Sequence, residues 1–282
     1  MITQNLKQAE FVIIDTETTG DTPGIDKPIE IAAVCWNIEK GFLDKPKSWL
    51  VNPQIPIHPS AMAVHHLMEE DIAEAPVIEK IQPEIEEMVN DKILVAHNAS
   101  FDMGMLPFLN NQEWVDSLRV ARHTWIKGMT NHQGHDLRSH KAQELRYWLG
   151  LKVDTMGLAA HRAAADILVT GEVFACAVKK YLELNEGNDD LSKFLTWARA
   201  PLQVKRITFG KYKDKELTEI PTDYYQWLLN KVAVNEFKMD DDLKNSIICE
   251  VRNRGIEPAD LIRTEEKANS WEEVAARRKI FT

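Results

Sequence analysis

Residues 11–20 are Phe11-Val12-Ile13-Ile14-Asp15-Thr16-Glu17-Thr18-Thr19-Gly20. The four apolar residues at the start of this stretch predict a β-strand that is buried on both faces. Side chains alternate along a strand, so Asp15 and Glu17 project from the same side. Two adjacent carboxylates repel each other, and a divalent cation between them would remove that repulsion. The simpler alternative, which the Asp-x-Glu pattern alone favours, is that both acids end the strand and face water.

The composition of the 282-residue chain, with 44% hydrophobic and 28% charged residues, is typical of a soluble globular protein. No apolar run approaches the roughly 20 residues that a membrane span needs, and the N-terminus lacks an apolar signal segment. The three cysteines are far apart, which argues against a zinc ribbon or a disulfide framework and suits a reducing compartment. We therefore expect a cytoplasmic protein that does not enter a membrane.

The net charge of the chain is −10, but its positive charges are concentrated in two segments. Residues 119–152 contain seven lysines and arginines against two carboxylates, and residues 193–216 contain the same numbers. Two basic segments in an otherwise acidic chain would suit a polyanion, such as nucleic acid, bound at a restricted site. The alternative is that both segments are ordinary solvated surface.

The apolar pattern along the chain predicts an α/β fold. Strands are expected at 11–14, 29–36, 48–51, 92–96 and 114–116, and helices at 77–89, 117–125, 141–149 and 161–184, with another helix that begins at Asn98 or Ser100. Short turns join the first three strands, so these should pair antiparallel. Together the elements predict a mixed-sheet α/β sandwich.

The chain is expected to divide into three parts. The main domain should cover residues 8–185, followed by a polar linker at 186–190. A small accessory domain is expected at 200–250, and residues 251–282 are expected to form a charged C-terminal tail.

Four acidic residues could converge on one site. Besides Asp15 and Glu17, Asp102 follows the strand at 92–96, and Asp166 lies near the start of the long last helix. His161 precedes Asp166 by five residues, which corresponds to a net rotation of about 140° in an ideal helix. His161 can therefore face the same site only if it lies in the loop before the helix.

Three segments resemble the motifs of the DEDDh 3′→5′ exonucleases, the DnaQ-like branch of the RNase H-like fold, and occur in that family's order. They are Asp15-Thr16-Glu17-Thr18-Thr19-Gly20, His97-Asn98-Ala99-Ser100-Phe101-Asp102 and His161-Arg162-Ala163-Ala164-Ala165-Asp166. Val64-His65-His66-Leu67 is similar to the family's Val-His-Gly-Ile segment, with His66 in place of Gly. Residues 209–228 resemble the C-terminal segment of the exonuclease X group. Each motif alone is weak, whereas their combination is specific.

The resemblance implies an RNase H-like sandwich and a metal-dependent hydrolase that releases nucleoside 5′-monophosphates from nucleic acid 3′ ends, with DNA the expected partner. It implies two bound Mg²⁺ or Mn²⁺ ions. By this resemblance, Asp15 bridges the two ions, Glu17 and Asp166 bind the first ion, and Asp102 supports the second. His161 would accept a proton from the attacking water. Arg162 stands where the family's other subclass has Tyr. Further substrate contacts are expected from Thr18, His65, Asn98 and Phe101.

Several of these residues have structural alternatives. Asn98 could cap the following helix, Phe101 could belong to the core, and His65 could be a packed surface histidine. His123, His132, His135 and His140 match no familiar zinc spacing and are expected in a polar loop.

Residues of the small domain could likewise either contact nucleic acid or have a structural role. Tyr224, Tyr225 and Trp227 could stack on bases, but Trp227-Leu228-Leu229 is expected in the small domain's core. Lys211, Lys213 and Lys215 would share one face if the segment were extended, and could then meet phosphates.

Two other functions remain open at this point. The first is an exoribonuclease of the same class, similar to oligoribonuclease or RNase T, because the metal motifs do not distinguish DNA from RNA. The second is a non-catalytic nucleic-acid-binding protein or proofreading partner that keeps the fold, although the intact acidic residues argue against it.

Overall fold

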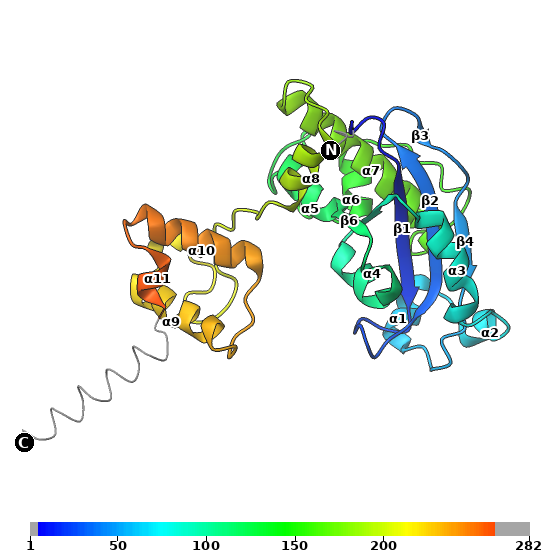
Figure 1. Ribbon diagram of the computed structural model, residues 1–282, viewed down its shortest axis with the longest axis horizontal. Coiled ribbons are helices and arrows are strands. Elements are labelled where there is room, and N and C mark those ends of the chain that lie inside the picture. Colours follow the sequence, from blue (N-terminus) through cyan, green and yellow to red (C-terminus); the bar gives the residue numbers. More distant parts are fainter. Residues whose placement is uncertain (1–4, 263–282) are drawn as a thin grey trace, which may run out of the picture. The chain divides into compact units, whose positions relative to one another are not determined.

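The computed structural model describes residues 5–262, which form two compact units that divide between Ala200 and Pro201 (Figure 1). Each unit is considered by itself. No helix in the described range is both long enough and apolar enough to cross a bilayer. Cys35, Cys176 and Cys249 are all free thiols.

A six-stranded mixed sheet forms the centre of the first unit. Its strands are β1 (Phe11–Thr18), β2 (Pro28–Asn37), β3 (Gly41–Phe42), β4 (Lys47–Leu50), β5 (Ile93–Ala96) and β6 (Glu113–Asp116), in the order β3-β2-β1-β5-β6 with β4 also paired to β2. The pairs β1–β2 and β2–β4 are antiparallel, whereas β1–β5 and β5–β6 are parallel. The predicted mixed sheet is therefore confirmed.

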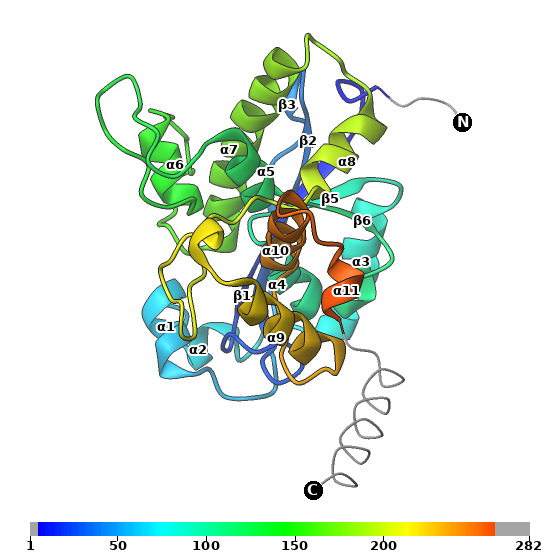
Figure 2. The same cartoon turned by 90° about the vertical axis from the view of Figure 1, so that its left-hand side faces the viewer.

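Helices cover both faces of this sheet. They are α1 (Pro59–His65), α2 (Glu69–Ile72), α3 (Ile78–Val89), α4 (Ala99–Met105), the short 3₁₀ helix η1 (Pro107–Leu109), α5 (Ser117–Thr124), α6 (Ala142–Trp148), α7 (Ala163–Leu184) and α8 (Leu191–Arg199). One core lies between the sheet and α5, α6, α7 and α8, and a second lies between the sheet and α3 and α4. Helix α7 packs along β1 and β2 (Figure 2).

Strand β1 contributes to both cores, as its apolar sequence predicts. Phe11 and Ile13 belong to the core on the α7 side, where Phe11 packs edge-on against Trp36 and Phe174. Val12 and Ile14 belong to the core on the α3 side. Because side chains alternate, Asp15 and Glu17 continue the row that faces α7.

The first unit extends beyond the expected boundary at residue 185. Helix α8 follows the expected linker, and its residue Phe194 is fully buried against Phe174 and Tyr181. Its apolar residues Leu191, Phe194 and Ala198 recur at helical spacing, so this helix could have been predicted.

The second unit is built from helices around its own core. It contains the 3₁₀ helix η2 (Leu217–Glu219), α9 (Thr222–Ala233), α10 (Asp241–Asn253) and α11 (Pro258–Leu261). Tyr225, Leu228 and Ile247 lie in its core. The fold thus continues past residue 250 into the first part of the expected tail, and residues 263–282 of that tail lie outside the described range.

One expectation for this unit is wrong, and the condition for another is not met. Trp227 is 51% exposed and does not belong to the core, because it lies on the opposite side of α9 from Tyr225 and Leu228. Lys211 and Lys213 lie in consecutive turns, and Asp214 between Lys213 and Lys215 has a positive φ of 67°. The segment is therefore not extended, and alternation does not place these lysines on one face.

Candidate metal and catalytic site

Three of the four predicted metal ligands meet in one place. Asp15, Glu17 and Asp166 each offer a carboxylate oxygen, and these oxygens all lie within 4.8 Å of one another. Asp15 and Glu17 project from β1 toward α7, and Asp166 lies in the first turn of α7. These side chains are named the carboxylate cluster below. Among the residues that the structure describes, it is the only group with metal-ligand spacing.

The fourth acid, Asp102 on α4, lies beside this cluster but not within it. Its side chain is buried, and Oδ1 accepts a hydrogen bond of 2.8 Å from the Thr16 hydroxyl. Burial raises the pKa of Asp102 to about 7, although the Thr16 hydrogen bond opposes this. After burial itself, the charge of Asp102 contributes most to raising the pKa of Asp15. The charge of Asp102 therefore acts on Asp15, although Asp102 is not among the three carboxylates with metal-ligand spacing.

The cluster carries a large electrostatic cost. Burial, followed by the charges of Asp166 and Glu30, raises the pKa of Glu17 to about 8, while Arg162 acts in the opposite direction. Burial and the neighbouring carboxylates also raise the pKa of Asp15 well above its usual value. Carboxylate oxygens are the preferred ligands of hard divalent cations, and such a cation would relieve this repulsion. The residues therefore fit a magnesium-like ion.

His161 lies in the loop before α7, outside the helix geometry. Its backbone has a positive φ of 62°, and its N–H donates a 2.8 Å hydrogen bond to Asp166 Oδ2. The other oxygen of Asp166 accepts a 2.9 Å hydrogen bond from Gln143 Nε2 on α6. Backbone and side chain together fix the orientation of this carboxylate. Gln143 was not predicted, because nothing in its local sequence connects it with Asp166.

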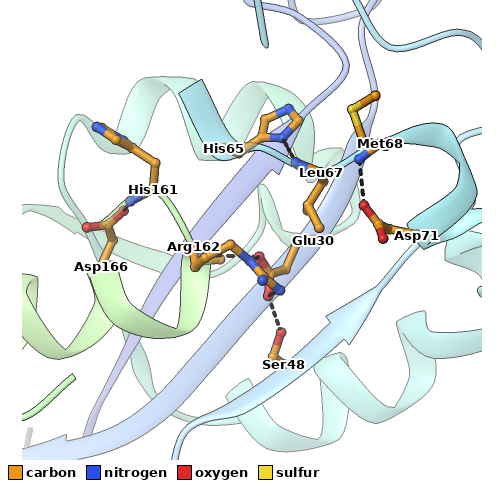
Figure 3. Close-up of polar contacts among 10 residues, drawn as sticks. Glu30, Ser48, His65, Leu67, Met68, Asp71, His161, Arg162 and Asp166 are labelled. Carbon is orange, nitrogen blue, oxygen red and sulfur yellow. Dashed lines mark hydrogen bonds and ion pairs between the residues drawn. The ribbon is translucent and has the colours of Figure 1, made fainter. Parts of the chain in front are cut away.

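An ion pair that was not predicted from the sequence lies beside the cluster (Figure 3). Glu30 on β2 is only 2% exposed, and it accepts hydrogen bonds from Arg162 Nε at 2.9 Å and Nη2 at 3.1 Å. Ser48 on β4 donates a further hydrogen bond of 2.8 Å to Glu30. Glu30 lies directly opposite Glu17 in the β1–β2 register. Arg162 therefore links the start of α7, next to His161, to the centre of the sheet.

A signal for this pair was present in the sequence. Glu30 is the only charged residue in the otherwise apolar strand sequence of β2. A buried charge needs a partner of opposite sign, and the cation next to His161 was available. The pairing itself follows from the strand register, which the sequence alone does not fix.

The four predicted substrate contacts occupy different environments. Thr18 is buried, and its hydroxyl donates to the carbonyl oxygen of Gly20 at 2.5 Å. His65 is also buried, so the alternative of a surface histidine is wrong, and burial lowers its pKa. Its Nδ1 accepts a 3.0 Å hydrogen bond from the Leu67 N–H, which closes α1. His66, at the position of the family's Gly, has the left-handed backbone that glycine favours.

The other two contacts lie at the start of α4. Asn98 is exposed at the N-cap position, but its side chain makes no capping hydrogen bond, so the capping alternative is wrong. Its φ of 83° turns the backbone left-handed, and its N–H donates to Asp116 instead. Phe101 is half-buried and belongs to neither core of the first unit. Phe101 therefore remains available to a ligand, whereas the Asn98 side-chain oxygen already accepts a 3.4 Å hydrogen bond from the Ser100 hydroxyl.

Three histidines in or near the polar loop have structural partners, namely His97, His123 and His140, and His123 lies in α5 rather than in the loop. The His140 ring donates to the Trp125 carbonyl oxygen at 2.7 Å, and the His97 ring donates to the His140 carbonyl oxygen at 2.7 Å. The His123 ring contacts the Ala200 carbonyl oxygen at 2.9 Å. These rings attach the loop and the end of the first unit to the body of the domain, which explains their presence without zinc.

Residues 12–174 match the model of a protein family described as an exonuclease. The chain belongs to the exonuclease family. It is 32% identical over 224 residues to Exodeoxyribonuclease 10 of Escherichia coli strain K12, which covers 78% of this chain and 90% of that protein. It is also 31% identical over 184 residues to DNA polymerase III PolC-type of Caldanaerobacter subterraneus, of which it spans 12%.

Solved structures of exonucleases agree with this family. A complex of Exonuclease X with 5′-overhanging duplex DNA matches with a TM-score of 0.53 at 31% identity, covering 66% of this chain and 99% of that one. Escherichia coli Exonuclease I, in complex with a dT13 oligonucleotide, shares the fold with a TM-score of 0.52 at 18% identity, covering 64% and 43%. The family expected from the sequence motifs is thus confirmed, and exonucleases of this family depend on divalent metals.

The buried ion pair can be tested by removing its cation. Arg162→Met should lower the free energy of unfolding by about 3 kcal/mol, because Glu30 is left charged and buried without a partner. The double variant Glu30→Met with Arg162→Met should recover most of this loss. Chemical denaturation of the full chain measures both effects. Lys180→Met, which breaks an exposed ion pair with Glu183 on α7, should cost no more than about 1 kcal/mol. Equal losses for Arg162→Met and Lys180→Met would contradict this role.

The electrostatic cost of the cluster predicts a dependence of stability on pH. The pKa of Glu17 in the folded protein is about 8, above its usual 4.5, so the metal-free protein should lose stability as pH rises between these values. Asp15→Asn removes the central charge and should raise the melting temperature in EDTA, by an amount that grows toward pH 8. Added Mg²⁺ should stabilise the wild type more than the variant.

The control for this experiment is Glu87→Gln, which changes an exposed carboxylate on α3 and should leave the melting temperature unchanged. The contradicting result would be a lower melting temperature for Asp15→Asn than for the wild type at pH 8 in EDTA. It would show that the charges of the cluster do not oppose folding.

Proposed function

We propose that this chain hydrolyses DNA from the 3′ end and releases nucleoside 5′-monophosphates, using divalent cations, Mg²⁺ or Mn²⁺, held at the carboxylate cluster. The observation that carries the proposal is the convergence of Asp15, Glu17 and Asp166 next to His161. The similarity to an exodeoxyribonuclease along 90% of its length supports DNA as the substrate. The three free cysteines fit a reducing, cytoplasmic location.

Each side chain would have a separate task. Asp15, Glu17 and Asp166 would hold the divalent cations, and Asp102 would support them from α4. Two such ions, when bound, would activate the attacking water and stabilise negative charge on the leaving oxygen. His161 would accept the proton of that water, because its exposed loop position leaves the ring free to approach. Gln143 would keep the Asp166 carboxylate in its orientation.

The terminal nucleotide would bind at the start of α4 and beside β1. Phe101 would stack on the base, since its ring is partly exposed and outside the cores. Asn98 would donate hydrogen bonds from its side-chain amide N–H groups, while its amide oxygen accepts one from Ser100. Thr18 and His65 lie buried near the end of β1 and would shape the wall of this site. Burial lowers the pKa of His65, which favours the neutral ring there.

The proposed reaction can be tested with end-labelled substrates. With Mg²⁺, the full chain should release labelled mononucleotide at once from 3′-labelled DNA and progressively shorten 5′-labelled DNA, and EDTA should stop both. Asp15→Ala should abolish the reaction, while Glu87→Ala, which removes an exposed carboxylate, should retain it. Full activity of Asp15→Ala would refute the assignment. Faster degradation of matched RNA would replace DNA by RNA as the substrate.

The role of His161 predicts a different pattern of loss. His161→Ala should slow hydrolysis by roughly 10²–10⁴-fold, the usual contribution of a general base. The affinity for Mn²⁺, measured by electron paramagnetic resonance in the absence of DNA, should stay close to that of the wild type. A parallel loss of Mn²⁺ affinity would identify His161 as a ligand instead.

A further inference from the structure

The second unit presents three aromatic rings in a row, named the aromatic shelf here: Tyr212, Tyr224 and Trp227. The Tyr212 and Tyr224 rings meet edge-on with centroids 4.8 Å apart. The Tyr224 and Trp227 rings are stacked, with centroids 5.3 Å apart and an interplanar angle of 26°. Trp227, at the end of the row, is 51% exposed and is not part of the unit's core. Folding of the unit therefore does not explain this tryptophan.

The local backbone supports the shelf. Helix α9 directs Tyr225 and Leu228 into the core, and the half-buried rings of Tyr212 and Tyr224 pack against that core. Trp227 alone of the three shelf residues lies outside it. The Tyr225 hydroxyl donates to the Leu217 carbonyl oxygen and fixes the helix. Gly210 has a φ of 69°, and a Cβ at this position would collide with the Tyr224 hydroxyl. The turn that carries Tyr212 can thus approach Tyr224 only because residue 210 is glycine.

Positive charge lies at the Tyr212 end of the shelf, while the exposed Asp223 adjoins Tyr224 in the sequence. Residues 205–216 contain five cations and two carboxylates, of which Arg206 and Glu216 form an ion pair, whereas residues 217–262 of the same unit contain nine carboxylates and five cations. The Lys211 ammonium lies 5.3 Å from the centroid of the Tyr212 ring. Lys211, Lys213 and Lys215 are exposed, and none of them forms an ion pair within the described part of the chain. The basic charge is therefore local and available to an external anion.

We propose that the aromatic shelf and Lys211 and Lys213 form a second nucleic-acid-binding surface, which takes single-stranded DNA. Bases would stack on the open face of Trp227, and the lysines would contact the phosphates. Exposed aromatic rings among cations are typical of surfaces that bind single strands, because unpaired bases offer their faces and phosphates offer negative charge. A duplex hides its base faces and would use only the lysines. The choice of DNA over RNA rests on the proposed function, whereas the binding itself requires no hydrolysis.

The test uses the full chain in EDTA, so that no cleavage occurs. Binding of a fluorescent oligothymidylate of about 20 nucleotides, longer than a typical single-strand site, is measured by anisotropy at several salt concentrations. Trp227→Ala should weaken binding by about 5- to 150-fold, the loss expected for one stacked base. Lys211→Gln with Lys213→Gln should lower the salt dependence of log affinity by about 0.7 for each lysine.

Matched variants separate binding from folding. Val234→Ala removes an equally exposed apolar side chain next to α9, and Lys244→Gln removes an exposed charge on α10. Both should bind like the wild type. Trp227→Phe should restore most of the affinity that Trp227→Ala loses, while all variants keep the wild-type melting temperature. Unchanged affinity in Trp227→Ala would overturn the proposal, as would an equal loss in Val234→Ala.

Two further measurements distinguish this site from the carboxylate cluster. Hydrolysis of the p-nitrophenyl ester of thymidine 5′-monophosphate with Mg²⁺, which needs only the cluster, should not change in Trp227→Ala. If the wild type fails to hydrolyse this ester or DNA, the proposed function fails, yet the loss of oligothymidylate binding can still be measured. An effect of Trp227→Ala on oligouridylate alone, with oligothymidylate unaffected, would overturn the assignment to DNA.

Discussion

Repulsion among half-buried carboxylates is the constraint on which the first unit depends. Asp15, Glu17 and Asp166 hold three oxygens within 4.8 Å of one another, and burial raises the pKa of both β1 carboxyl groups. A fold that maximised stability alone would not keep such a cluster, because like charges in a poorly solvated place oppose folding. The arrangement makes sense where a divalent cation supplies the missing positive charge. The surrounding contacts then keep the oxygens in place for that ion.

The sheet brings these acids together in space, although Asp15 and Asp166 are about 150 residues apart in the sequence. The alternation of β1 directs Phe11 and Ile13 into the core under α7, and the same row ends in Asp15 and Glu17. Helix α7 packs on that row, so its first turn places Asp166 over the two carboxylates. Arg162, just before this turn, is bound to Glu30 on the neighbouring strand. Apolar packing and one buried ion pair therefore set the geometry of the cluster.

The fold class and the family could be predicted from the sequence, because strong local patterns determine both. The apolar strand β1, the long helix α7 and the order of the three motifs predicted the fold class and the family. The pairing of Glu30 with Arg162 was not accessible, since it depends on the register that sets Glu30 opposite Glu17.

Backbone conformation explains the other misses. Asn98 adopts a left-handed φ that removes it from a capping role, and the turn at residues 211–214 keeps Lys211, Lys213 and Lys215 from sharing one strand face. Local patterns predict elements well, whereas contacts between elements require the assembled sheet.

The most direct measurement is a crystal structure of the full chain grown with Mn²⁺ and a nucleoside 5′-monophosphate, with anomalous scattering used to locate the ions. Anomalous peaks should lie within coordination distance of carboxylate oxygens of Asp15, Glu17 and Asp166, with the phosphate beside them. Peaks bound elsewhere, with these three side chains turned apart or paired with protein cations, would contradict the central role of the cluster.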